Sequence, residues 1–246
     1  MVPDELFERH ATVLNKIENA ERRAFGALTI AADEAVHNVT EALRASGAYD
    51  NSVIVIASDN GGNPSIEGSG SNYPLRGMKG DLWEGGVRVH ALVHSPRLPD
   101  SARGTTYQGL FHASDWLPTL VGGMLNSSHV FSNVKMDGVD QWRAITGESK
   151  REPRNELLLN IDDLSDADGQ AQGYVAAAIR VGSYKLIMNV DWAPVWPAPK
   201  VQDTSEATWP GDDDRIHMLG TYLFNLDDDP SETNDLSTKV RLKGRE

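Results

Sequence analysis

Residues 53–62 read "VIVIASDNGG", an apolar run that passes directly into Asp59, Asn60 and a pair of glycines. The run is mostly β-branched and does not alternate with polar residues, which is typical of a strand buried on both faces of a parallel sheet. In open α/β sheets, ligands gather at the carboxyl ends of the strands, where Asp59 and Asn60 stand. The stretch therefore predicts an α/β sheet with a binding site at its edge.

Asp59 and Asn60 each offer a side-chain oxygen to a hard cation such as Ca²⁺ or Mg²⁺. Because Ca²⁺ takes about six to eight oxygen ligands, these two residues can form only part of a metal site. Gly61 and Gly62 would let backbone and substrate approach closely. The alternative is an Asx-turn, in which the same two side chains bind their own backbone. Taken alone, the four residues favour the turn.

The segments around this strand carry helix and strand patterns. Residues 4–46 have apolar side chains at three- and four-residue steps, which predicts a helix with a possible break at Gly26 and an end at Gly47. The sequence "VRVHALVHS" at 87–95 predicts a second strand, and a helix is expected from its N-cap Ser114 to residue 125. A helix, a short loop and a buried strand in this order indicate an α/β domain.

The C-terminal part of the chain carries the pattern of short strands. Strands are expected at 156–161, at 221–226, and on both sides of "VGS" within 174–188, where a hairpin signal occurs. We therefore expect residues 1–155 to be part of a mostly parallel α/β sheet flanked by helices. Residues 156–246 are expected to form a small antiparallel sheet with a polar tail.

A second cluster, "LRGMKGDLWEGGVR" at 75–88, places three cations among glycines: Arg76, Lys79 and Arg88. This concentration is unusual because the chain carries a formal net charge of −13. A lysine presents a compact positive charge to a tetrahedral anion, and an arginine can clamp one with paired donors. The alternative is a solvated loop whose cations pair with its own two carboxylates, Asp81 and Glu84.

Composition excludes several classes of protein. The acidic surface would repel the phosphates of nucleic acid. No stretch approaches the roughly 20 apolar residues that a membrane span needs, and the acidic, polar start "MVPDELFERH" does not resemble a signal peptide. The chain has no cysteine, so it contains no disulfide, thiolate metal site or cysteine nucleophile. Sequons at Asn38 and Asn126 leave N-glycosylation open.

The two clusters together, "SDNGG" followed by "PLRGMKGDLWEGGVRV", resemble the type I sulfatases of the alkaline phosphatase superfamily, most closely the arylsulfatase B group. The resemblance continues, in the right order, through further segments spread over nearly the whole chain: "DEAVHNVTEAL" (33–43), "HASDWLPTL" (112–120), "MDGVDQW" (136–142), "RNELLLNID" (154–162), "AAIRVGSYKLI" (177–187) and "YLFNLDDDPSETNDLS" (222–237). A match over so many separated segments is far more specific than any single motif.

The resemblance implies a sulfuric-ester hydrolase that acts on aryl sulfates or sulfated sugars and is secreted or lysosomal. In the family a bivalent cation, usually Ca²⁺, sits under the sulfate, and a formylglycine hydrate is the nucleophile. By position, Asp59 and Asn60 match the second pair of metal ligands, and Lys79 matches the lysine that contacts the sulfate. Glu84 and Arg88 are expected to brace the loop.

One departure from the family pattern is large. The C/S-x-P-x-R motif that yields formylglycine is absent, and so are the first metal ligands, which the family carries in its N-terminal half. The chain is therefore expected to be a C-terminal portion that is inactive alone. His112 is expected to be structural, because the acid and base histidines of the family come from the missing half.

Two hypotheses of different classes follow. In the first hypothesis, the chain is part of a sulfuric-ester hydrolase, and its partners are a sulfate ester and a complementing N-terminal portion. The second is a non-catalytic remnant that binds sulfated ligands or a partner chain. A phosphodiesterase is disfavoured because "GMKGDLWEGGVR" is sulfatase-like. An interrupted sheet would expose apolar edges, so self-association is also expected.

Overall fold

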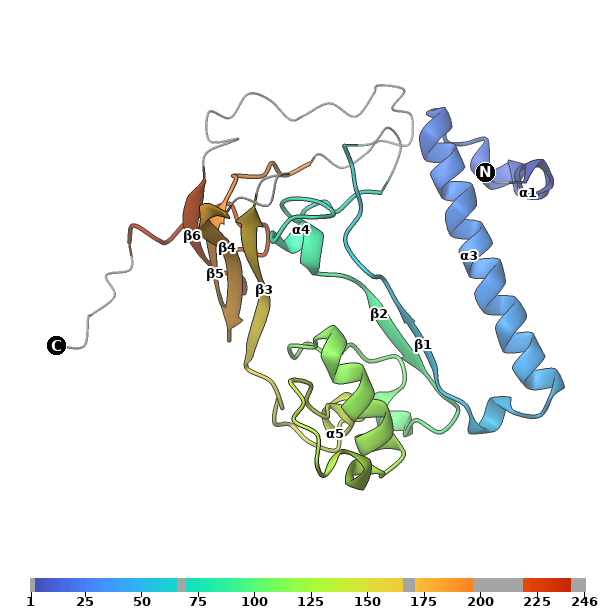
Figure 1. Ribbon diagram of the computed structural model, residues 1–246. Helices are drawn as coiled ribbons and strands as arrows, with labels where there is room; N and C mark the ends of the chain where they lie inside the picture. Colours follow the sequence, from blue (N-terminus) through green and yellow to red (C-terminus); the bar gives the residue numbers. More distant parts are fainter. Residues whose placement is uncertain (1–2, 66–69, 166–170, 197–218, 240–246) are drawn as a thin grey trace.

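The computed structural model describes residues 3–65, 70–165, 171–196 and 219–239 (Figure 1). A long helix, a two-stranded ribbon and a four-stranded sheet follow one another along the chain. Figure 1 shows the long helix α3 on one side of the molecule, the sheet on the opposite side and the ribbon between them. Within the described residues, no helix combines the length and the hydropathy that a membrane crossing requires.

The N-terminal helical region consists of three helices: α1 (Asp4–Arg9), α2 (Ala11–Leu14) and α3 (Ala20–Ala45). The main break lies before Asn19, whose side chain caps α3 by accepting a hydrogen bond from the Arg22 amide at 2.8 Å. The expected break at Gly26 is wrong. That glycine lies inside α3, where the Ile17 side chain comes within 3.3 Å of the place a Cβ would take. Gly47 follows the end of α3, as expected, with φ +73°.

The predicted strand at 53–57 is present as β1 (Ile54–Ala57), which pairs with β2 (Ala91–His94). The two strands are antiparallel. The prediction of a parallel pairing is therefore wrong for this strand, within the part of the chain that the structure describes. An apolar run shows that both faces of a strand favour burial, but it carries no information on the direction of the neighbouring strand. The burial is also incomplete, with Ile56 at 41% and Leu92 at 53% exposure.

The helix expected from Ser114 is divided into a 3₁₀ turn at Ala113–Asp115 and a π-helical segment at Pro118–Met124. The N-cap is His112 and not Ser114. The imidazole Nδ1 of His112 accepts a hydrogen bond from the Ser114 amide at 3.4 Å, and the His112 amide donates to Asp115 at 2.9 Å. His112 therefore has the structural role that was expected. Short helical pieces complete this part of the chain: α4 (Glu84–Val87), α5 (Trp142–Ile145), Tyr49–Asn51, Asp100–Ala102 and Ser128–Phe131.

The C-terminal strands form one antiparallel sheet in the order β3-β4-β5-β6: β3 (Glu156–Ser165), β4 (Ala171–Val181), β5 (Tyr184–Val190) and β6 (Gly220–Asn225). This confirms the small antiparallel sheet and the hairpin around "VGS". Gly182 takes φ +55° in the turn between β4 and β5, a conformation that glycine adopts without steric penalty. The end of the predicted polar tail, after residue 239, lies outside the described residues.

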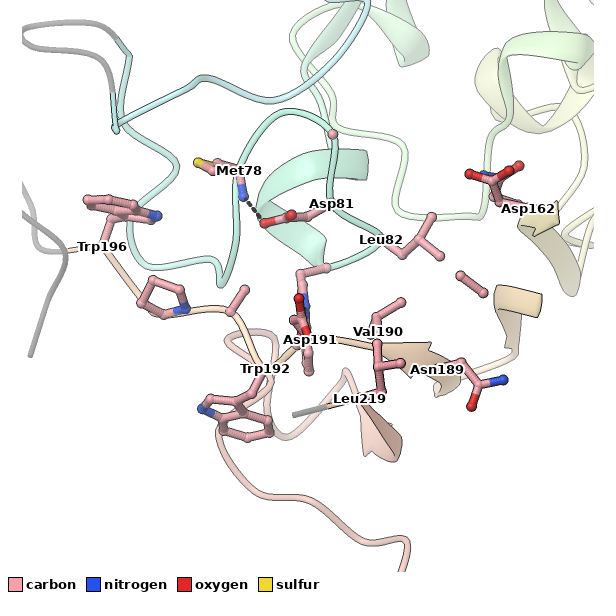
Figure 2. A pocket seen from close by; sticks show the side chains of 16 residues that line it. Met78, Asp81, Leu82, Asp162, Asn189, Val190, Asp191, Trp192, Trp196 and Leu219 are labelled. Atoms are coloured by element: carbon pink, nitrogen blue, oxygen red, sulfur yellow. Dashed lines mark hydrogen bonds between the residues drawn. The ribbon is translucent and has the colours of Figure 1, made fainter. Parts of the chain in front are cut away.

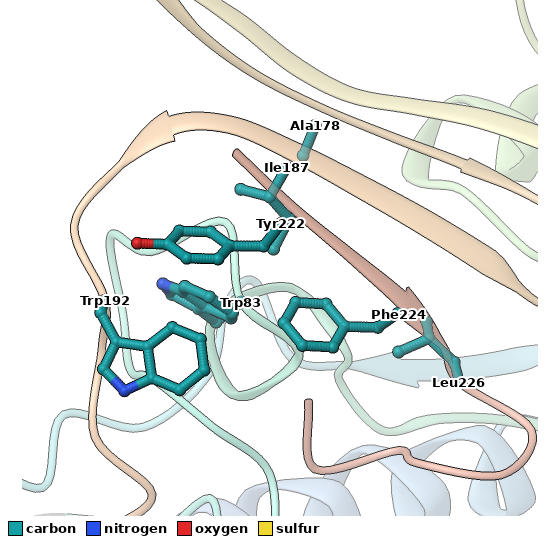
Figure 3. Packing of buried hydrophobic residues seen from close by; sticks show 7 residues of the cluster. All are labelled: Trp83, Ala178, Ile187, Trp192, Tyr222, Phe224 and Leu226. Atoms are coloured by element: carbon teal, nitrogen blue, oxygen red, sulfur yellow. The ribbon is translucent and has the colours of Figure 1, made fainter. Parts of the chain in front are cut away.

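One face of the sheet is covered by a side chain from far upstream in the sequence. Trp83 is 1% exposed, and its ring centroid lies 5.2 Å from that of Tyr222 and 5.6 Å from that of Phe224 (Figure 3). Trp192 adds an edge-on contact to Trp83 at 5.4 Å. Large aromatic rings dominate the burial in a small core. The loop with the three cations is therefore anchored in the core of the C-terminal sheet, and the boundary at residue 155 stays a prediction.

A second buried network joins three segments that are distant in the sequence. Asp115 is fully buried, and its two carboxylate oxygens accept hydrogen bonds from Arg154 Nε at 2.9 Å and Nη2 at 2.5 Å. The Val139 amide and the Gln141 side chain donate to the same carboxylate. Burial alone would raise the pKa of Asp115, but these hydrogen bonds, that of Arg154 first, lower it below its ordinary value.

Replacing Arg154 with methionine should lower the free energy of unfolding by about 3–5 kcal/mol, because the Asp115 carboxylate would remain buried without a counter-charge. Denaturant titration measures the effect. Arg143→Met is the matched control, since Arg143 is 73% exposed and 3.7 Å from Glu148, and it should change stability by less than about 1 kcal/mol. Equal losses in the two variants would contradict a special role for the buried pair.

Candidate functional site

The turn after β1 shows the local hydrogen bonds of the Asx interpretation. Asp59 Oδ1 accepts from the Asn60 amide at 2.9 Å, and Asn60 Nδ2 donates to the Gly61 carbonyl at 2.8 Å. These bonds leave Asp59 Oδ2 and Asn60 Oδ1 without a hydrogen bond from any described residue. Asp59 is exposed and Asn60 half-buried. The turn and a metal-binding role are therefore compatible, because each side chain uses one polar atom for the turn and keeps one oxygen free.

Asp59 Oδ2 and Asn60 Oδ1 are the kind of ligand that a hard cation binds, but two oxygens are too few to hold one. Ca²⁺ needs about six to eight oxygen ligands. Among the ranges that the structure describes, no group of three or more histidine, aspartate or glutamate side chains is arranged to hold a metal ion. A cation bound here would therefore need oxygen ligands beyond these two side chains, so the partial metal site stays a prediction.

Glycines bring this turn against the loop that carries Lys79. The Gly61 amide donates to the Gly86 carbonyl at 2.9 Å, and a Cβ on Gly61 would stand 1.7 Å from the Gly85 carbonyl oxygen. On the other side, a Cβ on Gly85 would lie 2.5 Å from the Arg76 carbonyl oxygen. Two backbones therefore pack directly on each other at a distance that only glycine permits.

The backbone of Lys79 is hydrogen-bonded to the segment that follows the turn. Its amide donates to the Gly62 carbonyl at 2.9 Å, two residues after Asn60. Asn72 strengthens the junction: its Oδ1 accepts from the Gly62 amide at 2.7 Å, and its Nδ2 donates to the Gly62 and Gly77 carbonyls. Sequence reasoning missed Asn72, because one asparagine in a segment rich in Gly, Ser and Asn carries no distinguishing signal.

The three cations of the loop have different environments. Arg76 is 5% exposed, lies 3.9 Å above the Trp192 ring and donates to the Glu232 carbonyl at 2.8 Å. Arg88 is about half exposed and 3.8 Å from Glu84. Lys79 is exposed and makes no ion pair with any other residue in the described part of the chain. Of the three, Lys79 is the exposed cation that has no carboxylate partner among the described residues.

A buried charge cluster lies behind this loop. Lys185 Nζ on β5 is 3.0 Å from Glu84 Oε1 and 2.8 Å from Glu232 Oε1, and all three side chains are at most 4% exposed. Burial raises the pKa of Glu232 to about 7, and the charge of Lys185 only partly offsets this. The expectation that Glu84 braces the loop is confirmed, whereas Lys185 and Glu232 were missed. A lone lysine in a strand and a glutamate in a turn give no sequence signal for such a cluster.

A cavity of about 320 Å³ lies between the loop and the sheet (Figure 2). Met78 and Gly80, the neighbours of Lys79, line it, and so do three carboxylates: Asp81, Asp162 and Asp191. Burial raises the pKa of Asp81, opposed by the hydrogen bond from the Met78 amide and assisted by the charge of Asp191. The acidic lining disfavours a sulfate in this cavity, so the anion is expected at Lys79 and not here.

Comparison with solved structures defines the class of the fold. The crystal structure of Ps i-CgsB in complex with k-i-k-neocarrahexaose matches with a TM-score of 0.66 and 25% sequence identity, covering 97% of this chain and 43% of that chain. PsFucS1 sulfatase from Pseudoalteromonas sp. matches with a TM-score of 0.56 and 23% identity, over 85% of this chain and 37% of that one. The fold is therefore that of the alkaline-phosphatase-like sulfatases.

Sequence comparison identifies the family. The sulfatase family model matches residues 6–126. Mouse (Mus musculus) arylsulfatase J is 37% identical over 96% of this chain and 40% of that protein, and human (Homo sapiens) arylsulfatase A is 30% identical over 68% of this chain and 31% of that protein. The chain belongs to the sulfatase family, as the motifs implied. It spans about 40% of the length of the mouse relative.

Proposed function

We propose that this chain is the C-terminal portion of a sulfuric-ester hydrolase that acts on aryl sulfates or sulfated sugars. Family membership supports the reaction class. The observation that carries the proposal is the environment of Lys79, an exposed cation whose amide is bound 2.9 Å from the Gly62 carbonyl beside the Asp59–Asn60 turn. A positive charge without an ion pair to any described residue, on a backbone held beside a turn with two unbonded side-chain oxygens, suits an anion and a metal ion bound together.

Three residues of this chain would have two different roles at the sulfate, metal binding and charge stabilisation. Asp59 and Asn60 would supply two of the roughly six to eight oxygen ligands of a Ca²⁺ ion. When bound, that ion would act as a Lewis acid on the sulfate oxygens. Lys79 would donate hydrogen bonds to the sulfate and stabilise the negative charge that develops as the S–O bond breaks. The glycine contact would keep turn and lysine at a constant separation.

The nucleophile is assigned to a part of the enzyme outside this chain. In the family it is a formylglycine hydrate, and no cysteine or serine here stands in a C/S-x-P-x-R motif. We therefore expect the chain alone to lack sulfatase activity.

The partner that we propose is a complementing N-terminal portion. Apolar side chains are exposed on the ribbon and on α3, among them Ile56, Leu92, Leu28 and Val39, each at 41% or more. Such surfaces favour association. The chain alone should therefore sediment as a species larger than its 26.9 kDa, whereas a stable monomer would argue against exposed contact surfaces.

A second candidate is a non-catalytic binding protein for sulfated ligands. The observation that favours it is the same: the chain holds Lys79 and part of a metal site but no nucleophile motif. The anion contact would then be weak, because two metal ligands and one lysine supply only part of the stabilisation.

An assay on a chromogenic aryl sulfate tests the proposal with two samples, this chain alone and the product of its complete gene. We expect no turnover from the chain alone, and turnover from the complete product that falls when a chelator removes divalent cations. Turnover by the chain alone would contradict the assignment of the nucleophile. A complete product that binds a sulfated saccharide without hydrolysing it would favour the second candidate.

A further inference from the structure

The buried cluster behind the loop joins three segments that are far apart in the sequence. Glu84 begins α4, Lys185 lies on β5, and Glu232 lies in the turn region after β6. The two carboxylates share the one ammonium group, at 3.0 Å and 2.8 Å. We call these three residues the buried clamp.

Glu232 holds both ends of the loop that contains Lys79. Its Oε2 accepts a hydrogen bond from the Glu84 amide at 2.7 Å, and its backbone carbonyl accepts one from Arg76 Nε at 2.8 Å. Directly after Glu84, the Gly85 amide donates to the Arg76 carbonyl at 2.6 Å and closes the loop. The backbone that presents Lys79 is therefore held at both ends by a single residue.

The buried clamp has two features that cost stability, backbone strain and an unsatisfied buried oxygen. Glu232 has φ +54°, which is strained for a residue with a side chain. Glu84 Oε2 is buried without a hydrogen-bond donor among the described residues, and Arg88 Nη1 is 3.8 Å from it. Glu232 Oε1, by contrast, contacts Lys185 Nζ at 2.8 Å. Well-packed apolar residues often replace buried ion clusters without loss of stability. Strain and unsatisfied groups of this kind concentrate where a site needs a defined geometry.

We propose that Glu232, supported by Lys185, is a positioning residue that holds Lys79 beside the Asp59–Asn60 turn. This inference rests on the proposed function, because it assigns a task to the clamp within that same site. Glu232 does not touch the sulfate. It acts through two hydrogen bonds, one from the Arg76 side chain to its carbonyl and one from the Glu84 amide to its carboxylate, which restrict where the loop, and with it the ammonium group, can lie.

Two substitutions separate positioning from general stability. Glu232→Gln keeps an oxygen acceptor for the Glu84 amide and has the same backbone strain as the natural residue. Glu232→Gly removes the side chain but adopts φ +54° without strain. If the side chain positions the loop, the glutamine variant should largely preserve the contact with the Glu84 amide and the glycine variant should lose it, while the backbone carbonyl of residue 232 can still accept from Arg76 in both variants.

Amide hydrogen exchange on the 246-residue chain is the first readout. In Glu232→Gly, we expect exchange of the Lys79 and Gly85 amides to accelerate by about tenfold or more, because local opening no longer has to break the clamp. The Val139 amide, bound to Asp115 in the other buried network, is the internal reference and should not change. Unchanged exchange at Lys79, or an equal acceleration at Val139, would overturn the proposal.

Activity of the complete gene product on an aryl sulfate is the second readout. We expect Glu232→Gly to lower kcat by about a hundredfold, as small misplacements of a catalytic group do, and Glu232→Gln to restore most of that loss. Wild-type kcat in the glycine variant would overturn the positioning role. If the wild-type product has no sulfatase activity, the proposed function fails, whereas the exchange experiment still decides whether Glu232 holds the loop.

Discussion

Lys79→Ala should lower kcat of the complete gene product on an aryl sulfate by about 10²–10³-fold, because the variant loses a charge that stabilises the breaking S–O bond. The lysine is exposed and has no ion pair with a described residue, so little stability depends on it. The thermal midpoint should therefore stay within about 2 °C of the wild type, the shift expected of a surface substitution. Steady-state kinetics and thermal unfolding on the same preparations separate the two effects.

The control for this experiment is Lys150→Ala, which removes another exposed lysine that lies far from the loop in sequence. Lys150→Ala and Lys79→Ala change the net charge by the same amount, so a loss of kcat caused by long-range electrostatics would appear in both variants. A Lys79→Ala enzyme that keeps its kcat within threefold of the control would refute the assignment of this lysine to the sulfate. Lys79→Arg should recover only part of the activity, since a planar guanidinium does not reproduce the point charge of an ammonium group.

Gly61→Ala should separate the turn after β1 from the loop that carries Lys79. Its Cβ would stand 1.7 Å from the Gly85 carbonyl oxygen and 2.8 Å from the Gly85 carbonyl carbon, and backbone atoms cannot rotate away as a side chain can. The turn and the loop must then separate, with loss of the bond from the Gly61 amide to Gly86. We expect the free energy of unfolding to fall by about 3 kcal/mol, measured by denaturant titration.

Gly122→Ala is the matched control, because nothing lies closer than 4.0 Å to the place its Cβ would take. This control should remain within about 0.5 kcal/mol of the wild type. A Gly61 variant as stable as the Gly122 variant would show that the two backbones can separate freely, and the constant spacing of turn and lysine would then lose its support. Loss of activity should accompany the loss of stability, since both depend on the same contact.

Local signals in the sequence predicted several elements correctly. Gly47 ends α3 and Gly182 forms the hairpin turn, and both have a positive φ that glycine adopts without penalty. The strands around "VGS" follow from their β-branched and apolar pattern. These features depend on residues close in sequence, so periodicity and turn chemistry could reveal them. The predicted helix break at Gly26 was wrong. The glycine lies inside α3, and the close approach of the Ile17 side chain accounts for a residue without a Cβ at this position.

The sequence by itself determined the family, the position of the strand that ends at Asp59 and Asn60, and the lysine loop, because motifs with specific spacing carry that information. Only the tertiary structure decided which cations of the loop are buried and which are exposed. Arg76 is buried through a partner 156 residues away, Glu232, whereas Lys79, three residues further on, is left exposed. The physical reason is that burial and pairing depend on contacts between distant segments, which have no period or local signature in the chain.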